Sequence, residues 1–400
     1  MNTATRSEPG KLDAGELWDA VVIGGGPAGS VAARQLALRG VRTALIEATV
    51  FPRRKVCGGC LNARALAALE QVGLSAAVGE CRPTTINAVD LWRGGQQVSI
   101  STPCGVAVSR SRLDDALLNA AASAGVCVVT GTQATVGTID GEPWREIHLR
   151  HHDQSRNAIR ARVVVACDGL GRPSLRELPE FAARPALGSR IGAGATLPAK
   201  AARCIPRERI VMAVGRAGYV GAVRLGDGAG NLAAALDPQL VAAADLGAAV
   251  QQLLHEAGVA GLSNLPELQW RGTRPLTQRS PLAAAERLFL VGDAAGYVEP
   301  FTGEGMAAAI DSAIAVAPLA ADAVEGWTES LAGDWSRRQR RTVQSRETTI
   351  AALAWTLRRP TVAAAAFGAA RRFPQFASFV ARRVGGAPRR AENKEASWAS

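Results

Sequence analysis

The strongest constraint in this sequence is a glycine-rich segment near the N-terminus that lies between two short apolar runs. Residues 20–23 are apolar and mostly β-branched, which predicts a buried strand. Three glycines with GxGxxG spacing follow at once: Gly24, Gly26 and Gly29. Residues 28–39 are rich in Ala, Leu, Arg and Gln and predict a helix that ends at Gly40. Residues 43–46 predict a second strand, which ends at Glu47.

Each position of this strand–helix–strand unit suits the binding of a dinucleotide. Gly24 permits a tight turn, Gly26 lets a pyrophosphate approach the backbone, and Gly29 lets the helix pack on the strand. Pro27 suits a first helical turn because its missing N–H would be unpaired there. With Ala28 it opens a helix whose N-terminal N–H groups and partial positive charge attract an anion.

Glu47 lies eighteen residues after Gly29, at the end of the second predicted strand. A carboxylate at this place accepts hydrogen bonds from an adenosine ribose. It favours the unphosphorylated ribose of FAD or NAD over that of NADP. The alternative is a glycine-rich turn in another α/β protein, but such a turn does not need the helix and the acidic residue found here.

The composition is that of a globular protein, with 400 residues, 48% of them hydrophobic, which is enough for a buried core. Residues 1–15 are polar, so we expect a disordered N-terminus and no signal peptide. No run of eighteen apolar residues predicts a transmembrane helix. Several of the seven cysteines sit in apolar runs, as buried thiols do in a reducing compartment. We therefore expect a cytoplasmic protein.

Positive charge is concentrated at the C-terminus. Residues 331–400 contain fourteen Arg or Lys and four Asp or Glu, and so carry most of the net charge of +11. No recognition motif accompanies this charge, so nucleic acid is not an expected partner. One predicted helix places Phe376, Phe379 and Val380 on one face and arginines on the other. This pattern is typical of peripheral contact with an anionic membrane, and also of a docked terminal helix with solvated arginines.

The remainder of the chain alternates between helical and strand patterns. Further helices are predicted over residues 63–71, 114–124, 240–257 and 306–323. A hairpin with Arg93-Gly94-Gly95 at its turn joins strands at 86–92 and 96–101. Short apolar runs separated by Gly, Pro and Asp turns fill residues 186–236. They predict an antiparallel sheet inserted into the first domain.

Three separated segments carry a resemblance to a known superfamily. They are the unit at 19–47, the pair Asp168-Gly169 after a strand, and Gly292-Asp293 followed by Pro300-x-x-Gly303-x-Gly305. Together they resemble the FAD enzymes of the para-hydroxybenzoate hydroxylase type, which include aromatic monooxygenases, flavin halogenases and geranylgeranyl reductases. The resemblance implies non-covalent FAD.

The resemblance also implies roles for individual residues. The fingerprint glycines would hold the pyrophosphate, Glu47 the ribose and Asp293 the ribityl chain. The helix after Gly305 would point its N-terminus at the N1/C2 carbonyl side of the flavin, where reduction leaves negative charge. Arg110, in an Arg-x-x-Leu-Asp stretch, would be a further contact. The implied cofactor-binding residues are Gly24, Gly26, Pro27, Ala28, Gly29, Glu47, Arg110, Asp168, Gly169, Gly292, Asp293, Gly303, Gly305 and Met306.

The fold implied is an α/β fold of two domains and a tail. A doubly wound, Rossmann-type FAD-binding domain would contain 16–80, 104–178 and 275–330. An inserted antiparallel β-sheet substrate domain would contain 81–103 and 179–274. Residues 331–400 would form a basic, helical C-terminal segment.

Two stretches lean toward the geranylgeranyl reductase branch: Pro300-Phe-Thr-Gly-Glu-Gly305 and Lys55-Val-Cys57-Gly-Gly59, although that branch commonly has a third glycine where Cys60 stands. One departure concerns the electron donor. Relatives usually have Ser and Arg in tight spacing after Asp-Gly, whereas Arg172, Ser174 and Arg176 are spread further here. Direct reduction by NADPH is therefore in doubt. We expect the electrons to come from NAD(P)H or from another donor.

The pair Cys57 and Cys60 has three interpretations. A CxxC can be half of a zinc site, but no second CxxC or paired histidine supplies the other ligands, so no metal is expected. A redox dithiol or disulfide would need a second dinucleotide fingerprint, and none is visible. We favour a loop that lines the flavin pocket, with Cys57 near the ring.

These features lead to three hypotheses of function. The first is reduction of C=C bonds in a hydrophobic, isoprenoid-type small molecule, with hydride from the reduced flavin and a proton from the Cys57 thiol. The second is an FAD-dependent monooxygenase that hydroxylates an aromatic or polyketide-like substrate. The third is a non-catalytic flavin-binding protein.

Overall fold

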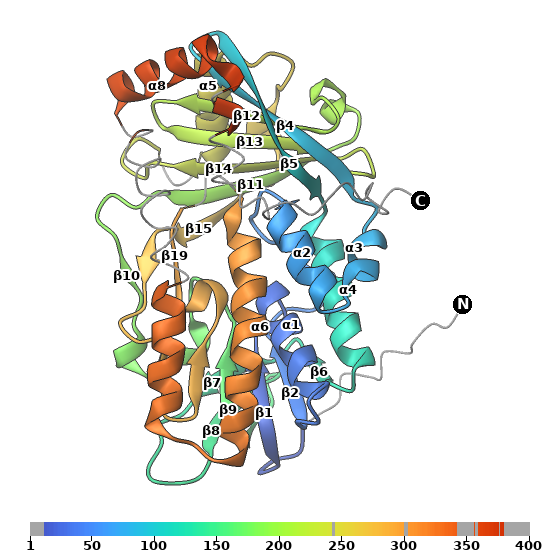
Figure 1. The fold of residues 1–400 in the computed structure, drawn as a ribbon, viewed down its shortest axis with the longest axis vertical. Coiled ribbons are helices and arrows are strands. Elements are labelled where there is room, and N and C mark those ends of the chain that lie inside the picture. The colour runs from blue at the N-terminus through green and yellow to red at the C-terminus, as the bar shows by residue number, and fades with distance from the viewer. Residues whose placement is uncertain are drawn as a thin grey trace.

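The computed structural model describes residues 12–241, 245–299, 303–341, 356, 359–375 and 377–379. Two large sheets form two tiers (Figure 1): the lower tier contains β1, β2, β6 and β9, and the upper tier contains β4, β5 and β11 to β14. The segments Pro300 to Thr302 and the positions Phe376 and Val380, on which two of the expectations depend, lie outside the described residues.

The lower sheet is built around the predicted fingerprint strand. Its five parallel strands, in spatial order, are β18 (Leu288–Leu290), β9 (Arg156–Ala166), β1 (Leu17–Ile23), β2 (Thr43–Glu47) and β6 (Cys127–Thr130). Val22 pairs with Leu45 on one side and with Val165 on the other, and all three are fully or almost fully buried. A strand with neighbours on both sides and helices above it must be apolar throughout, which explains the run at 20–23.

Antiparallel strands extend this sheet at its other edge. They are β7 (Gln133–Val136) and β8 (Arg145–Arg150), which continue from β9, and β17 (Ala284–Ala285), which pairs with β18. Two helices cover one face, α1 (Pro27–Ala37) and α6 (Glu304–Glu325), and α4 (Arg110–Ser123) packs on α1 (Figure 1). The predicted doubly wound α/β domain is thus present.

Helix α6 meets the length and hydropathy expected of a membrane span, by length and composition only. However, 56% of its apolar window is buried, and it packs on α1, β1 and β9. It is therefore accounted for as a core helix of the lower tier.

The upper sheet is mostly antiparallel. Its strands, in spatial order, are β15 (Arg271–Pro275), β11 (Ile191–Leu197), β14 (Gly230–Leu236), β13 (Gly218–Arg224), β12 (Arg209–Gly215), β4 (Thr84–Arg93), β5 (Gln96–Ala107) and β3 (Cys60–Leu61). Helix α5 (Leu246–Ala257) packs on one face, where β-branched and aliphatic residues form a separate core. The expected inserted antiparallel sheet is confirmed, with one exception: β4 and β12 run parallel.

Small elements join the two tiers. Helices α2 (Ala63–Gln71) and α3 (Ser75–Gly79) follow β3, and Asn62 caps α2 by accepting the N–H of Ala65 at 2.9 Å. A three-stranded sheet lies beneath the upper tier and contains β10 (Arg184–Pro185), β16 (Gln278–Arg279) and β19 (Gly296–Tyr297).

Three predicted helix starts are wrong. Helix α4 begins at Arg110 and not at 114, because Ser109 is the first extended residue before it and Arg110 pairs with Asp114 one turn later. Helix α6 begins at Glu304 and not at 306. Gly303 before it adopts a left-handed φ of +72°, which is not helical, so the helix starts at the next residue. Helix α5 begins at 246, where Asp245 accepts the N–H of Ala248.

The described part of the basic C-terminal segment is anchored in both tiers. Trp335 is 1% exposed in the lower core, where its Nε1–H donates to the Leu290 carbonyl at 2.9 Å. Helix α8 (Pro360–Arg372) buries Ala363 and Phe367 and lies beside β5 (Figure 1). This segment therefore contains docked structure as well as charge.

Candidate functional site

Two of the three glycines of the GxGxxG fingerprint after β1 are closely packed. Gly24 has a φ of +104°, and a Cβ there would lie 2.6 Å from the Cys167 carbonyl oxygen. A Cβ on Gly29 would lie 1.8 Å from the Gly24 carbonyl oxygen. A Cβ on Gly26, in contrast, would meet one described atom within 4 Å, the Arg53 Nη2 at 3.4 Å. The fold itself thus requires Gly24 and Gly29, whereas the space at Gly26 is open to a ligand.

The Gly292-Asp293 pair packs against the first turn of α1. Pro27 and Ala28 are buried at its start. A Cβ on Gly292 would lie 3.1 Å from the Ala28 Cβ, so Gly292 lets the Gly-Asp turn sit directly on α1. This contact places Asp293 beside the fingerprint although 264 positions separate Gly29 from Asp293 in the chain.

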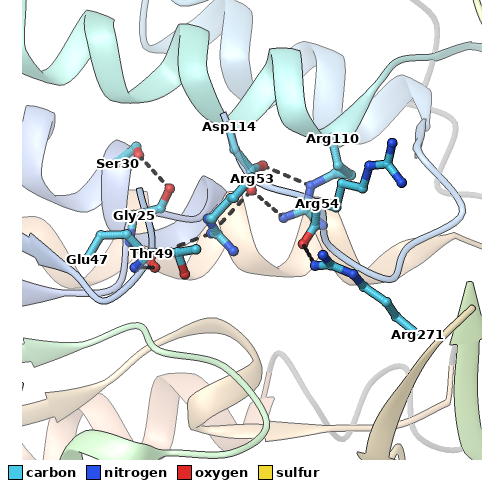
Figure 2. A network of polar contacts seen from close by, with 9 residues as sticks. All are labelled: Gly25, Ser30, Glu47, Thr49, Arg53, Arg54, Arg110, Asp114 and Arg271. Atoms are coloured by element: carbon cyan, nitrogen blue, oxygen red, sulfur yellow. Dashed lines mark hydrogen bonds and ion pairs between the residues drawn. The ribbon is translucent and has the colours of Figure 1, made fainter. Parts of the chain in front are cut away.

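Glu47 ends β2 within a buried network of charged groups (Figure 2). Its Oε2 accepts the Gly25 N–H at 2.8 Å, and its Oε1 accepts the Thr49 N–H at 2.9 Å. Arg53 lies between Glu47 and Asp114, with its Nη2 at 3.7 Å from Glu47 Oε2 and 3.2 Å from Asp114 Oδ2. The carboxylate is held in place by these bonds and retains lone pairs for a ribose hydroxyl.

Arg110 faces the same buried carboxylate from the other side. Its Nε and Nη2 donate to the two oxygens of Asp114 at 2.8 and 2.9 Å, and Asp114 is 0% exposed. Burial by itself lowers the pKa of Arg110, but the charges of Asp114 and Cys57 hold that pKa above its usual value. The guanidinium is therefore a permanent cation next to the Cys57 thiol.

Asp293 lies near two cationic side chains, Lys55 and Arg110. Burial raises its pKa, and the cations Lys55 and Arg110 oppose that rise. Burial also lowers the pKa of Lys55, helped by Arg53 and Arg110. The side-chain carboxylate of Asp293 forms no hydrogen bond to any residue that the structure describes, so it can accept one from a bound ligand.

The Asp168-Gly169 turn contributes an unpartnered oxygen. Asp168 Oδ2 accepts the Ser174 N–H at 2.8 Å, while Oδ1 is buried without a partner within the described residues. A Cβ on Gly169 would lie 3.8 Å from Lys55 Nζ, and a Cβ on Gly24 would lie 2.9 Å from the Asp168 Cα. Buried polar atoms are normally paired, so this oxygen marks a place where a ligand donor fits.

The segment after Asp168 does not present its arginine outward. Arg172 is buried and its Nη1 donates to the Phe181 carbonyl at 3.0 Å. Its Nε and Nη2 are buried without a partner within the described residues, whereas Arg176 is exposed.

The start of α6 lies at the same junction. A Cβ on Gly305 would lie 3.2 Å from the Tyr297 ring. Burial raises the pKa of Glu304, which Arg64 and Asn62 bind at 3.3 and 3.1 Å. Gly303 caps the helix. The Met306 side chain is buried in the lower core, so only the backbone of Met306 can face a cofactor. The N-terminal end of α6 thus points from the core toward Tyr297.

Cys57 and Cys60 occupy a loop that connects the two tiers. Both thiols are free. Asn231 of β14 donates to the Cys57 carbonyl at 2.9 Å, and the Gly59 carbonyl accepts the Val108 N–H at 2.7 Å. Burial and the nearby Cys57 raise the pKa of the Cys60 thiol to about 12. No cluster of three potential metal ligands is found in the part of the chain that the structure describes.

The residues present fit FAD at this site. The open backbone at Gly26, the unpartnered Asp168 oxygen and the unbonded Asp293 carboxylate lie around one turn, as a bound dinucleotide with a ribityl chain requires. Sequence reasoning missed four neighbours of the site: Arg53, Lys55, Asp114 and Tyr297. Asp114 was visible in the Arg-x-x-Leu-Asp stretch, but nothing in the sequence marked Tyr297.

Comparisons with known proteins agree with this cofactor. Residues 18–186 match the family model described as an FAD binding domain. A menaquinone reductase of Mycolicibacterium smegmatis is 28% identical over 76% of this chain and 75% of its own length. A rifampicin monooxygenase of Streptomyces venezuelae is 28% identical over 78% and 65%. A digeranylgeranylglycerophospholipid reductase of Methanocaldococcus jannaschii is 25% identical over 81% and 82%.

Solved structures with the same fold include halogenases and monooxygenases. A myxobacterial chondrochloren halogenase has a TM-score of 0.72 at 20% identity, covering 92% of both chains. The p-nitrophenol 4-monooxygenase of Pseudomonas putida has a TM-score of 0.71 at 18% identity, covering 92% of this chain and 97% of its own. At this identity the likeness concerns the fold alone.

The first prediction separates the two kinds of glycine. Gly29→Ala forces a Cβ against the Gly24 carbonyl, and overpacking of this kind costs about 1–3 kcal/mol, so the melting temperature of the FAD-free protein should fall. Gly26→Ala should leave that temperature unchanged but weaken FAD binding in a fluorescence titration, because the methyl group enters the pyrophosphate space. A Gly26→Leu protein that still holds stoichiometric FAD would contradict this assignment.

The second prediction concerns the two thiols. With a pKa of about 12, Cys60 has roughly one part in ten thousand as thiolate at pH 8. Iodoacetamide at pH 8 should therefore label the exposed Cys104 and Cys204 before Cys60, as read by mass spectrometry of the FAD-loaded protein. Reductive titration should consume two electrons per subunit; uptake of four would show a redox dithiol.

The family match and the geometry of the site concern the same part of the chain. The matched region contains the fingerprint, Glu47, Arg110 and Asp168, and the structure adds Asp293 from far along the chain. Reductases and monooxygenases both occur among the relatives, so the cofactor and the class of chemistry are common to them while the reaction differs. This protein contains an FAD-binding domain over residues 18–186 and is an FAD-dependent oxidoreductase, similar to members of the para-hydroxybenzoate hydroxylase-like superfamily.

Proposed function

We propose that the protein reduces C=C bonds of a hydrophobic, isoprenoid-type small molecule. The observation that carries the proposal is the place of Cys57. Its thiol neighbours the permanent cation Arg110, and its backbone carbonyl accepts a hydrogen bond from Asn231 of the upper sheet. A group that can give a proton thus lies where the cofactor site meets the sheet that we assign to the substrate.

The face of the upper sheet that looks toward the cofactor site is apolar. Met212, Val214, Tyr219, Ala235 and Leu276 form a cluster there. Tyr297 and Leu170, from segments next to Asp293 and Asp168, pack against this cluster. An apolar surface of this kind suits a hydrophobic substrate and keeps water away from the reacting atoms.

The chain's own residues have separate tasks in this proposal. Gly26, Asp168 and Asp293 would hold FAD, which supplies a hydride in its reduced form. Saturation of a C=C bond also needs a proton at the second carbon, and the Cys57 thiol is the acid that we assign to it. The resulting thiolate lies beside Arg110, whose charge stabilises it until water returns the proton.

Names of relatives support this choice without deciding it. Two of the relatives reported above are reductases, one of menaquinone and one of a digeranylgeranylglycerophospholipid, and both match over about three quarters or more of each chain. The second candidate is hydroxylation of an aromatic or polyketide-like substrate, which the rifampicin monooxygenase favours. A flavin-binding protein without turnover is the third class.

The third prediction tests the reaction. Reduced protein, mixed without oxygen with menaquinone, polyprenyl lipids or aromatic compounds, should have its flavin reoxidised by a polyprenyl compound. Cys57→Ala should slow this step by about 10²–10⁴-fold, as expected on loss of a general acid, while Cys60→Ala should have little effect. Reoxidation that needs oxygen and is stimulated by an aromatic compound would favour the monooxygenase, and no substrate effect at all would favour the third class.

We also propose peripheral contact between the C-terminal segment and an anionic membrane. Phe373 and Phe379 are 61% and 49% exposed, and Arg371 and Arg372 next to them are exposed as well. Aromatic rings with adjacent arginines suit a membrane interface, where each arginine contributes about 1 kcal/mol. The opposite arrangement, with both rings covered, would favour a docked helix only.

The fourth prediction tests this contact. The FAD-loaded protein should bind phosphatidylglycerol vesicles at low salt and be released at high salt. The double substitution Phe373→Ser and Phe379→Ser should abolish binding in a flotation assay, with FAD content and melting temperature unchanged. Failure of the unaltered protein to bind at low salt would reject the proposal.

A further inference from the structure

A hollow on the outer side of the upper sheet gathers positive charge. It lies between η3 (Ala201–Cys204), with the loop after it, and the turn that joins β13 to β14, and it encloses about 410 Å³. Its charged lining residues are Lys200, Arg203, Arg207, Arg224 and Asp227. This volume falls within the range of small-molecule sites.

The carboxylate in this lining is already engaged. Asp227 Oδ1 accepts the Ala229 N–H at 3.1 Å, and its Oδ2 lies 4.0 Å from Arg112 Nη2. Within the described part of the chain, none of the four cations forms a hydrogen bond or ion pair. Arg224 Nε is also buried without a partner. The hollow thus presents several unpaired side-chain donors, and its one carboxylate is already engaged by Ala229 and Arg112.

The backbone that carries these side chains is tightly packed. A Cβ on Gly226 would lie 2.0 Å from the Arg82 carbonyl oxygen, and one on Gly230 would lie 3.0 Å from Leu197. Gly228 has a φ of +85° and faces Ala199 at 3.5 Å. Because the turn cannot shift without a clash, the backbone beside Arg224 is fixed before any ligand arrives, which reduces the ordering cost of binding.

We propose that this hollow binds a phosphate or diphosphate group. Four cations around a hollow whose one carboxylate is already bonded suit a multiply charged anion better than a singly charged one. Arginine forks also bind phosphate oxygens in pairs. The group belongs to a free phosphate ester or to a lipid headgroup. The proposal does not rest on the reduction of C=C bonds, since it needs no flavin chemistry.

The test uses the FAD-loaded protein, so that the dinucleotide site is filled. Pyrophosphate should bind saturably at low salt in isothermal titration calorimetry, and more weakly as salt increases. The double substitution Arg203→Gln and Arg207→Gln should weaken binding by about tenfold or more, since both side chains are exposed and the fold does not need them. Arg224→Gln should weaken it independently.

Arg216→Gln is the matched control. Arg216 is an exposed arginine at the opposite end of β13, roughly 20 Å away along a seven-residue strand, and should leave pyrophosphate binding unchanged. Two further arms identify the source of the phosphate. Competition by geranylgeranyl diphosphate indicates a free ester, and binding to phosphatidic acid vesicles that the Arg203/Arg207 substitutions abolish indicates a headgroup.

The outcome that overturns the proposal is equally defined. Pyrophosphate binding that is absent at low salt, or that is as tight in the Arg203/Arg207 and Arg224 variants as in the Arg216 control, would show that the hollow is not an anion site. Either result would leave the anaerobic reoxidation assay unaffected, so the failure of this proposal is distinct from failure of the proposed reaction.

Discussion

The buried carboxylate of Asp114 is the interaction on which the site depends. It is fully buried, and Arg53 and Arg110 approach it from two sides, so its charge is compensated inside the protein. Removing one partner of a buried ion pair costs about 3–5 kcal/mol of folding stability, because the remaining charge is then buried without a compensating partner. Arg53 in turn reaches Glu47 at the end of β2. One carboxylate on α4 therefore positions both Arg53, which reaches Glu47, and the cation beside Cys57.

The loop from Arg53 to Leu61 transmits this arrangement to the upper sheet. The Arg54 carbonyl accepts from Arg271 of β15 at 3.3 Å (Figure 2). Val56 packs so closely on β11 that a Cβ on Gly194 would lie 3.2 Å from its side chain. Further along, the Cys57 carbonyl binds Asn231, and Cys60 with Leu61 pairs with β5 as β3. The loop is thus attached to strands along the upper sheet, from β15 to β5.

How much could be predicted depended on whether the signal was local. The strand, the three glycines and Glu47 lie within 30 residues, and each has a local steric or electrostatic reason, so their arrangement was predictable. The start of α4 was predicted wrongly because the usual signal, a cap residue before an apolar run, also fits Ser111 to Asp114. The pairing of Arg110 with Asp114 across one helical turn depends on burial by α1 and by Arg53, which lie elsewhere in the chain.

The sequence by itself determined the cofactor, the α/β class and the inserted sheet, because backbone geometry and hydrophobic period impose these through neighbouring residues. Only the tertiary structure decided which side chains meet. Asp293 reaches the fingerprint because Gly292 has no side chain to hold it away from Ala28. Tyr297 meets the start of α6 for the same reason at Gly305. Cys57 lies against the upper sheet because Asn231, 174 residues later, donates to its carbonyl. Contacts over such separations follow from packing of the whole chain, which no local pattern encodes.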